Sequence, residues 1–374
     1  MPPSDDPTAR LARLQSYLTA DPANTALVLE TTEAALAARA FPVAADLLTR
    51  LRQAGPLDAR ARSLEGLAAM GMGDFASAAE AFGELARERP DEPAIRFNLA
   101  WSLAMTKRFE EALGLISPDL AAALPQAAML EVQLLHELRQ FDAALARAKV
   151  HIETHPGHPG LMASVSVLAV DVEDLELAAA CAAQGGELSD AQTTLGTIAL
   201  GEDRADLARA HFEKALSGNP NAPRALIGIG LTALLSGAPL EAARQIERGA
   251  TLFEDHLGSW LAAGWARLIA GEYANARRHF EHALSIDDTF AESHGSLGVV
   301  AAIEGDVEEA KRRTDISLRL DRHCFSGALA RALLQQARGN ADVAQAIIER
   351  ALHTPIDASG KTIAQSLAKQ GLFA

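Results

Sequence analysis

The chain has 374 residues, of which 49% are hydrophobic but only 5% are aromatic, so its apolar residues are mainly Ala and Leu. Both residues are strong helix formers, and no stretch alternates in the manner of a strand, so the composition predicts an all-α fold. The formal net charge of −15 disfavours nucleic acid as a partner, because a negatively charged surface repels the phosphate backbone.

Cysteine content and hydropathy argue against further classes of protein. Cys181 and Cys324 form no CxxC pair, so we predict neither a disulfide framework nor a structural zinc site. The acidic, Pro-rich N-terminus does not have the pattern of a secretory signal, and no run approaches the roughly 18 apolar residues of a membrane-spanning helix. We therefore expect a cytoplasmic protein without membrane insertion.

The first predicted element is a helix over residues 7–22, with Leu11, Leu14 and Leu18 on one face. We interpret residues 1–24 as an N-terminal tail and capping helix. At the other end, residues 359–374 are predicted to form a C-terminal capping helix. An open stack of helices needs such caps for its solubility.

Between these ends the sequence repeats with a period of 34 residues. Three stretches, beginning at Leu195, Ile229 and Ala263, can be aligned in one frame. In each unit a glycine is followed by a small residue and then by a large apolar one. The recurring residues are Gly196, Gly230, Gly264 and Gly298; Ala208, Ala242, Ala276, Ala310 and Ala344; and Phe212, Ile246, Phe280 and Ile348, with Ala332 in the fifth glycine position and Thr314 in the fourth apolar position as departures.

Each unit is predicted to be a pair of helices, in which Gly and a capping Asp or Asn separate the two, as at Gly73-Asp74. Such a pair is too short to bury its own apolar face and must stack on its neighbours. We count ten units, in residues 25–188 (repeats 1–5) and 189–358 (repeats 6–10), with the third and fifth shortened. The units begin near Thr25, Ala59, Pro93, Pro125, Pro159, Ser189, Pro223, Leu257, Ala291 and Phe325.

This pattern resembles the tetratricopeptide repeat, which has Trp, Leu-Gly and Tyr on its first helix and Ala, Phe and Pro on its second. The best match to the first helix is Trp260, Ala263 and Gly264, with Arg267 in the Tyr position. The best match to the second helix is Ala208, Phe212, Ala215 and Pro220. The resemblance covers nearly the whole chain and implies a right-handed α-solenoid, a superhelix of stacked antiparallel helix pairs.

Two histidine groups could suggest a metal site, and we favour a simpler interpretation of both. His151, His155 and His158 surround a predicted helix C-terminus, where the helix dipole and free carbonyls favour histidine. His279 and His282 lie three residues apart, but Lys214 occupies the position of His282 two repeats earlier. We expect no metal, no cofactor and no enzymatic activity, because the chain also lacks a nucleophile elbow, a phosphate-binding loop and an HExxH motif.

The resemblance implies instead that the first helices line a concave groove that binds peptides. The residues it places in this groove are Phe97, Trp101, Met105, Met129, His136, Ile227, Leu231, Leu234, Trp265, Leu268, Ile269 and Ile303, with Arg60 and Arg224 at the rim. Trp and Met anchor apolar groups and adapt to different partners. We therefore expect a non-catalytic scaffold or adaptor that binds a peptide or an amphipathic helix of another protein.

Other interpretations remain open at this point. Tight coiling of the superhelix could bury the same apolar residues between neighbouring units. The chain could also assemble with itself into a homo-oligomer, or serve as the regulatory subunit of a separate enzyme or of a secretion or chaperone complex.

Overall fold

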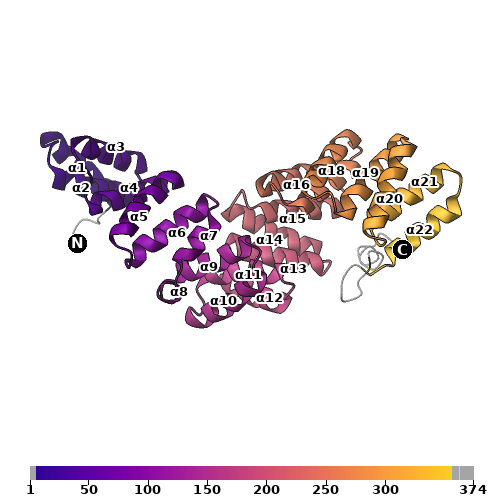
Figure 1. The fold of residues 1–374 in the computed structure, drawn as a ribbon, viewed down its shortest axis with the longest axis horizontal. Helices are drawn as coiled ribbons and strands as arrows, with labels where there is room; N and C mark the ends of the chain where they lie inside the picture. Colours follow the sequence, from indigo (N-terminus) through magenta and orange to yellow (C-terminus); the bar gives the residue numbers. More distant parts are fainter. Residues whose placement is uncertain (1–5, 356–361, 363–374) are drawn as a thin grey trace. The chain divides into compact units, whose positions relative to one another are not determined.

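The computed structural model describes residues 6–355 and 362. These residues form 22 α-helices, and their only β-type pairing is an isolated antiparallel bridge between Pro355 and Thr362. The chain divides into two compact units, residues 1–172 (unit 1) and 173–374 (unit 2), which are described separately below. The protein is an all-α solenoid of stacked antiparallel helix pairs (Figure 1).

The helix bounds in unit 1 are α1 (Pro7–Ala20), α2 (Thr25–Ala37), α3 (Phe41–Ala54), α4 (Ala59–Met72), α5 (Phe75–Glu88), α6 (Pro93–Met105), α7 (Phe109–Leu115), α8 (Pro118–Ala123), α9 (Pro125–Glu137), α10 (Phe141–Thr154) and α11 (Pro159–Asp171). Those in unit 2 are α12 (Leu175–Gly185), α13 (Ser189–Gly201), α14 (Ala205–Gly218), α15 (Pro223–Leu235), α16 (Pro239–Phe253), α17 (Leu257–Ile269), α18 (Tyr273–Ile286), α19 (Ala291–Glu304), α20 (Val307–Leu320), α21 (Phe325–Ala337) and α22 (Ala341–Leu352).

The first helices α2, α4, α6, α9, α11, α13, α15, α17, α19 and α21 begin at the ten residues from which the 34-residue period counts its units. The grouping of the repeats into residues 25–188 and 189–358 stays a prediction. In the third repeat the second helix, α7, is only seven residues long, and Pro118 starts the extra helix α8. The C-terminal capping helix predicted for residues 359–374 lies outside the described residues, apart from Thr362.

The turn inside each pair contains one residue with a left-handed backbone. Glycine occupies this position in five turns, at φ values between 74° and 82°, for example at Gly73 and Gly305. Five other turns place a residue with a side chain there: Arg39, Lys107, Arg139, Glu173 and Asp203, at φ between 56° and 60°. A side chain in this conformation is strained, so the repeat geometry overrides local preference at these positions.

A large side chain on the second helix packs against glycine on the first. Phe82, Phe212 and Phe280 are fully buried. A Cβ atom added at Gly264 would lie 2.3 Å from Phe280 Cε1, and one at Gly196 would lie 2.6 Å from Phe212 Cε1. The two helices of a pair therefore approach so closely that only glycine fits, which explains why Gly and Phe recur together.

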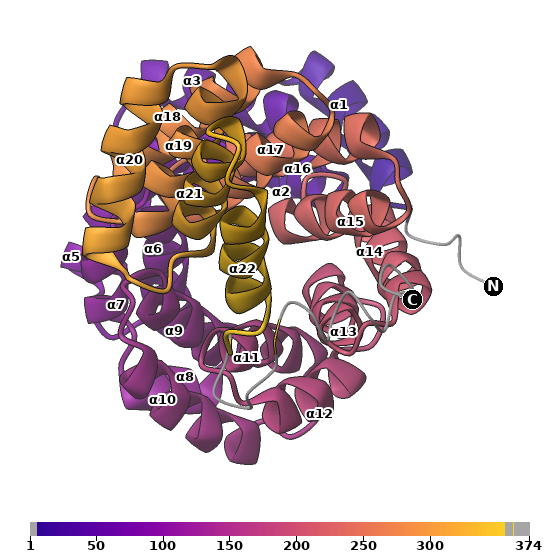
Figure 2. The ribbon, with the colours of Figure 1, turned by 90° about the vertical axis from the view of Figure 1, so that its right-hand side faces the viewer.

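Within each unit, successive first helices contact one another, as α2 does α4, α9 does α11, and α19 does α21. Second helices also pack on the first helix of the next pair, as α5 does on α6 and α16 does on α17. The last pairs of unit 2 show this order, with α19, α20, α21 and α22 packed side by side (Figure 2). At the start of unit 1, α1 covers α2 with Leu11 and Leu14 buried.

Candidate functional site

An apolar row recurs at the end of three consecutive first helices in unit 2. Leu235, Ile269 and Ile303 are each the thirteenth residue counted from the start of α15, α17 and α19. Their side chains are 36%, 58% and 39% exposed. We call these three residues the apolar row. Because they are large, apolar and exposed at one repeated position, they are the candidate contact surface of unit 2.

The other predicted groove residues of unit 2 lie deeper than the apolar row. Ile227, Leu231 and Leu234 are partly buried against the core between α15 and α16. Leu268 and Trp265 pack against the next core cluster, and the indole of Trp265 meets the ring of Phe280 edge-on at 5.8 Å. These side chains belong to the cores of unit 2 and are less exposed than the apolar row.

In unit 1 the predicted groove residues on α6 form one helical stripe. Phe97 and Trp101 are partly buried against the core, with their ring centroids 6.2 Å apart. Met105, one turn further on, is 49% exposed. Met129 on α9 is partly buried and lies beside Gly160 of α11. A Cβ atom added at Gly160 would be 3.2 Å from the Met129 sulfur.

The polar residues predicted for the groove are engaged within the chain. His136 Nε2 lies 2.7 Å from a carboxylate oxygen of Asp171, which links α9 to α11. Arg60 on α4 donates to Glu33 on α2 through Nε (2.9 Å) and Nη2 (2.5 Å). The guanidinium of Arg224 lies 5.7 Å from the centre of the Phe253 ring. These contacts join neighbouring helices, so a partner would meet side chains that are already held in place.

Sequence reasoning missed Leu235, because it selected the neighbouring Leu234. Leu235 is the more exposed of the two, and it lies 34 residues before Ile269. The period that identified Ile269 and Ile303 could therefore have identified Leu235. Sequence reasoning also missed Met72, which is 47% exposed at the end of α4.

The first histidine group has three separate structural roles. His151 is buried on α10, and its Nε2 lies 2.6 Å from Glu131 of α9, which also accepts two hydrogen bonds from Arg147. His155 Nε2 lies 2.8 Å from the carbonyl oxygen of Ala121. His158 caps α11 by accepting a hydrogen bond from the next turn. The Glu131 carboxylate is the residue of this cluster that sequence reasoning missed.

The second histidine group surrounds Trp260 of α17. The rings of His279 and His282 lie 5.6 Å and 4.4 Å from the Trp260 ring. His279 Nε2 also lies 3.1 Å from Glu247 of α16. Burial of the His279 imidazole lowers its pKa and outweighs the opposing effect of Glu247. The pair thus packs an aromatic side chain between α17 and α18, and among the described residues no group of three or more His, Cys, Asp or Glu is arranged to hold a metal ion.

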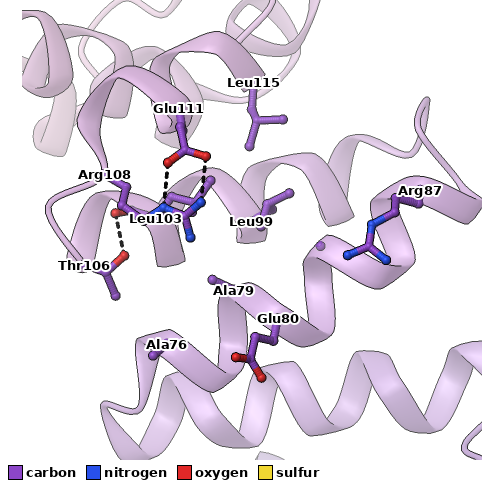
Figure 3. A pocket seen from close by; sticks show the side chains of 11 residues that line it. Ala76, Ala79, Glu80, Arg87, Leu99, Leu103, Thr106, Arg108, Glu111 and Leu115 are labelled. Carbon is purple, nitrogen blue, oxygen red and sulfur yellow. Dashed lines mark hydrogen bonds and ion pairs between the residues drawn. The ribbon is translucent and has the colours of Figure 1, made fainter.

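Furrows also occur away from the first-helix surface, between successive second helices. In unit 1 a furrow of about 510 Å³ lies between α5 and α7, with Leu99 and Leu103 of α6 at its floor (Figure 3). Arg108 and Glu111 pair along one wall, and Glu80 and Arg87 lie on the other. The two positive and two negative charges of this furrow therefore cancel.

The sequence profile of the tetratricopeptide repeat family matches residues 63–117 and 193–256. These two segments lie within the helix pairs whose 34-residue period and Gly–Phe packing are described above. These two segments are tetratricopeptide repeats. Proteins built from stacked helical repeats present extended surfaces for binding other proteins.

Several solved structures are similar to this tetratricopeptide-repeat chain. MamA is 17% identical, with a TM-score of 0.35, over 48% of this chain and 98% of MamA. PilF from Pseudomonas aeruginosa is 16% identical, with a TM-score of 0.42, over 50% of this chain and 88% of PilF. A chain of the Cut9–Hcn1 hetero-tetramer of the APC/C is 14% identical, with a TM-score of 0.42, over 96% of this chain and 92% of that one.

A comparison with curated protein sequences finds no match. In the described part of this tetratricopeptide-repeat chain, no helix has both the length and the apolar character needed to cross a membrane.

Proposed function

We propose that this tetratricopeptide-repeat protein is a non-catalytic scaffold that holds a peptide or an amphipathic helix of another protein against its first helices. The observation that carries the proposal is the apolar row of Leu235, Ile269 and Ile303. The cytoplasm, as expected from the sequence, is the location that we propose with it.

The apolar row suits an apolar or amphipathic partner. Each row residue has an apolar neighbour one turn before it on its own helix: Leu231 before Leu235, Trp265 before Ile269, and Val299 before Ile303. Leu231 and Trp265 are partly exposed, whereas Val299 is buried. A ligand side chain beside Leu235 or Ile269 would therefore contact apolar groups on more than one side. The stripe Phe97, Trp101 and Met105 offers a second apolar surface in unit 1.

The energy available from the row can be estimated from its exposure. Complete burial of an Ile side chain stabilises by about 1.5–3 kcal/mol. Because Ile269 and Ile303 are about half exposed, covering each contributes about 1 kcal/mol. Loss of both side chains should then weaken binding by about 2 kcal/mol, or about 30-fold in Kd.

The experiment selects peptides from a phage-displayed library on the full chain and measures their affinity by fluorescence anisotropy. We expect apolar or amphipathic peptides whose Kd rises about 30-fold for the double variant Ile269→Gln/Ile303→Gln. A matched control is Leu252→Gln/Leu320→Gln, which changes side chains that are 44% and 46% exposed at the ends of second helices. Equal loss of affinity in both double variants, or in neither, would refute the proposal.

The same variants separate partner binding from self-assembly. If the row joined two copies of the chain, sedimentation velocity would show an oligomer that Ile269→Gln/Ile303→Gln converts to monomer. A monomer at all concentrations, together with peptide binding, supports the scaffold.

A further inference from the structure

A furrow at the end of unit 2 differs from the others in its charge. It has a volume of about 280 Å³ and lies between the second helices α20 and α22, with α21 at its floor. Its walls are apolar side chains and four basic ones. The residues that line it are Leu318, Ala328, Val343, Ala346, Ile347, Ala351 and Thr354, with Arg322, His323, Arg331 and Arg350. We call it the basic furrow.

No described carboxylate lines the basic furrow. The side chains of Arg331 and Arg350 make no hydrogen bond or ion pair within the residues that the structure describes. Arg322 Nε donates to His323 Nε2 at 3.0 Å, so this contact also leaves the positive charge without an acid partner. By contrast, Arg312 and Arg313 on α20 are paired with Glu309 of the same helix.

The other furrows lack this excess of positive charge. The furrow between α5 and α7 contains two acidic and two basic side chains, and the one between α1 and α3 contains the ion pair of Asp46 with Arg50. Four basic side chains beside an apolar floor, with no carboxylate among the described lining residues, therefore distinguish the basic furrow from these two furrows, in a chain whose formal charge is −15. Such a site attracts a carboxylate and offers burial to an apolar group next to it.

The size of the furrow favours a side chain over a small molecule. Small-molecule pockets usually measure about 300–1,000 Å³ and enclose most of the ligand, whereas this furrow is open and its volume of about 280 Å³ lies just below that range. Leu318, Val343 and Ile347 can surround one or two apolar side chains.

We propose that the basic furrow docks an acidic segment of another protein. One or two apolar side chains of the segment enter between α20 and α22, and its Asp or Glu residues contact Arg331 and Arg350. This site is separate from the apolar row on the first helices, so either surface can fail without the other.

The charge of the chain's own C-terminal segment disfavours it as the occupant. Residues 356–374 contain one acidic residue, Asp357, and two basic ones, Lys361 and Lys369. The side chains of this segment carry a net charge of +1, which does not complement the arginines of the furrow. An acidic segment of another protein complements their positive charge.

The test selects phage-displayed 12-residue peptides on the full chain and counter-selects on the double variant Arg331→Glu/Arg350→Glu. We expect clones that bind only the wild-type chain, and we expect them to be rich in Asp and Glu next to apolar residues. In fluorescence anisotropy with one such peptide, the double variant should bind at least about 10-fold more weakly. A salt increase from 50 to 300 mM should weaken wild-type binding.

Two matched controls accompany these variants. Arg13→Glu in unit 1 makes the same kind of charge change at an exposed arginine outside the furrow and should leave binding unchanged. Ala346→Phe fills the furrow and should abolish binding, whereas Gln345→Phe, one residue earlier on the same helix but outside the lining, should not. Circular dichroism of each variant confirms that its helix content is retained.

Four outcomes would overturn the proposal. The first is that no clone depends on the two arginines, and the second is that the dependent clones are not acidic. The third is stronger binding of a 15-nucleotide single-stranded RNA than of the peptide, which would make the furrow a phosphate site. The fourth is a dimer in sedimentation that Arg331→Glu/Arg350→Glu dissociates, which would make a second copy of the chain the occupant.

Discussion

Replacing Glu131 with Met should destabilise unit 1, and a second substitution should restore it. The Glu131 side chain on α9 is only 12% exposed, and the His151 side chain on α10 is only 2% exposed. Glu131 accepts hydrogen bonds from Arg147 at 2.9 and 3.1 Å, and it lies 2.6 Å from His151 Nε2. This cluster joins the two helices of the fourth repeat.

The magnitude follows from what each partner loses. In Glu131→Met, the ring nitrogen of His151 stays buried without an acceptor, which costs about 1–3 kcal/mol. Arg147 is 31% exposed and can turn toward water, so its loss adds less. We expect a decrease in the free energy of unfolding of about 2–3 kcal/mol. In Glu131→Met/His151→Leu an apolar pair replaces the polar one, and stability should return to within about 1 kcal/mol of the wild type.

The assay is urea unfolding followed by circular dichroism, combined with amide hydrogen exchange of α9 and α10. Exchange is needed because a repeat array need not unfold in one step. If the double variant were as unstable as the single one, the cost would come from lost packing of Glu131 and not from an unpaired His151. That result would refute the reasoning.

The pH dependence of Glu131 has a defined sign. Burial acts to raise the pKa of Glu131, but the hydrogen bonds from His151 and Arg147 outweigh burial and hold the pKa below its ordinary value. A lowered pKa in the folded state means that the carboxylate stabilises the fold above its ordinary pKa and loses this effect as the pH falls. The difference in stability between the wild type and Glu131→Met should therefore shrink in acid, below about pH 4.5.

Three further predictions concern the repeats. Gly264→Ala should destabilise unit 2 by about 1–3 kcal/mol in urea unfolding, because its Cβ would clash with Phe280, and Phe280→Leu in the same chain should relieve part of the loss. Arg39→Gly should raise the free energy of unfolding by up to about 1 kcal/mol, because Arg39 has a φ of 56°; an unchanged or lower stability would contradict this. Hydrogen bonds from Arg312 and Arg313 lower the pKa of Glu309 to about 2, so the stability difference between wild type and Glu309→Gln should vanish as the pH falls from 4.5 to 2.

The helical pairs could be predicted from sequence because the packing of each pair imposes a recurring residue pattern. Phe280 needs a residue without a side chain opposite it, so Gly264 must stand at a fixed distance before it in the chain. The same requirement returns every 34 residues, and the period shows where each first helix begins. The short helix α7 follows from the shortened third repeat and from Pro118.

The accessibility of individual side chains could not be predicted in this way. Trp265 occupies a predicted groove position, yet its ring packs on Phe280, because a large aromatic side chain can bend toward the core of its own pair. Arg60 pairs with Glu33 of the preceding first helix, and the 34-residue pattern contains no information about such a contact. Leu235 shows the opposite case, since the period alone could have identified it.

The central claim, that the apolar row binds a peptide, is tested most directly by methyl NMR of the ¹³C-labelled isoleucines. A peptide selected on the full chain is added to the labelled protein. The proposal predicts that the methyl signals of Ile269 and Ile303 shift with peptide concentration, whereas that of Ile286, at the end of the second helix α18, does not. A shift of Ile286 with Ile269 and Ile303 unchanged would contradict the proposal.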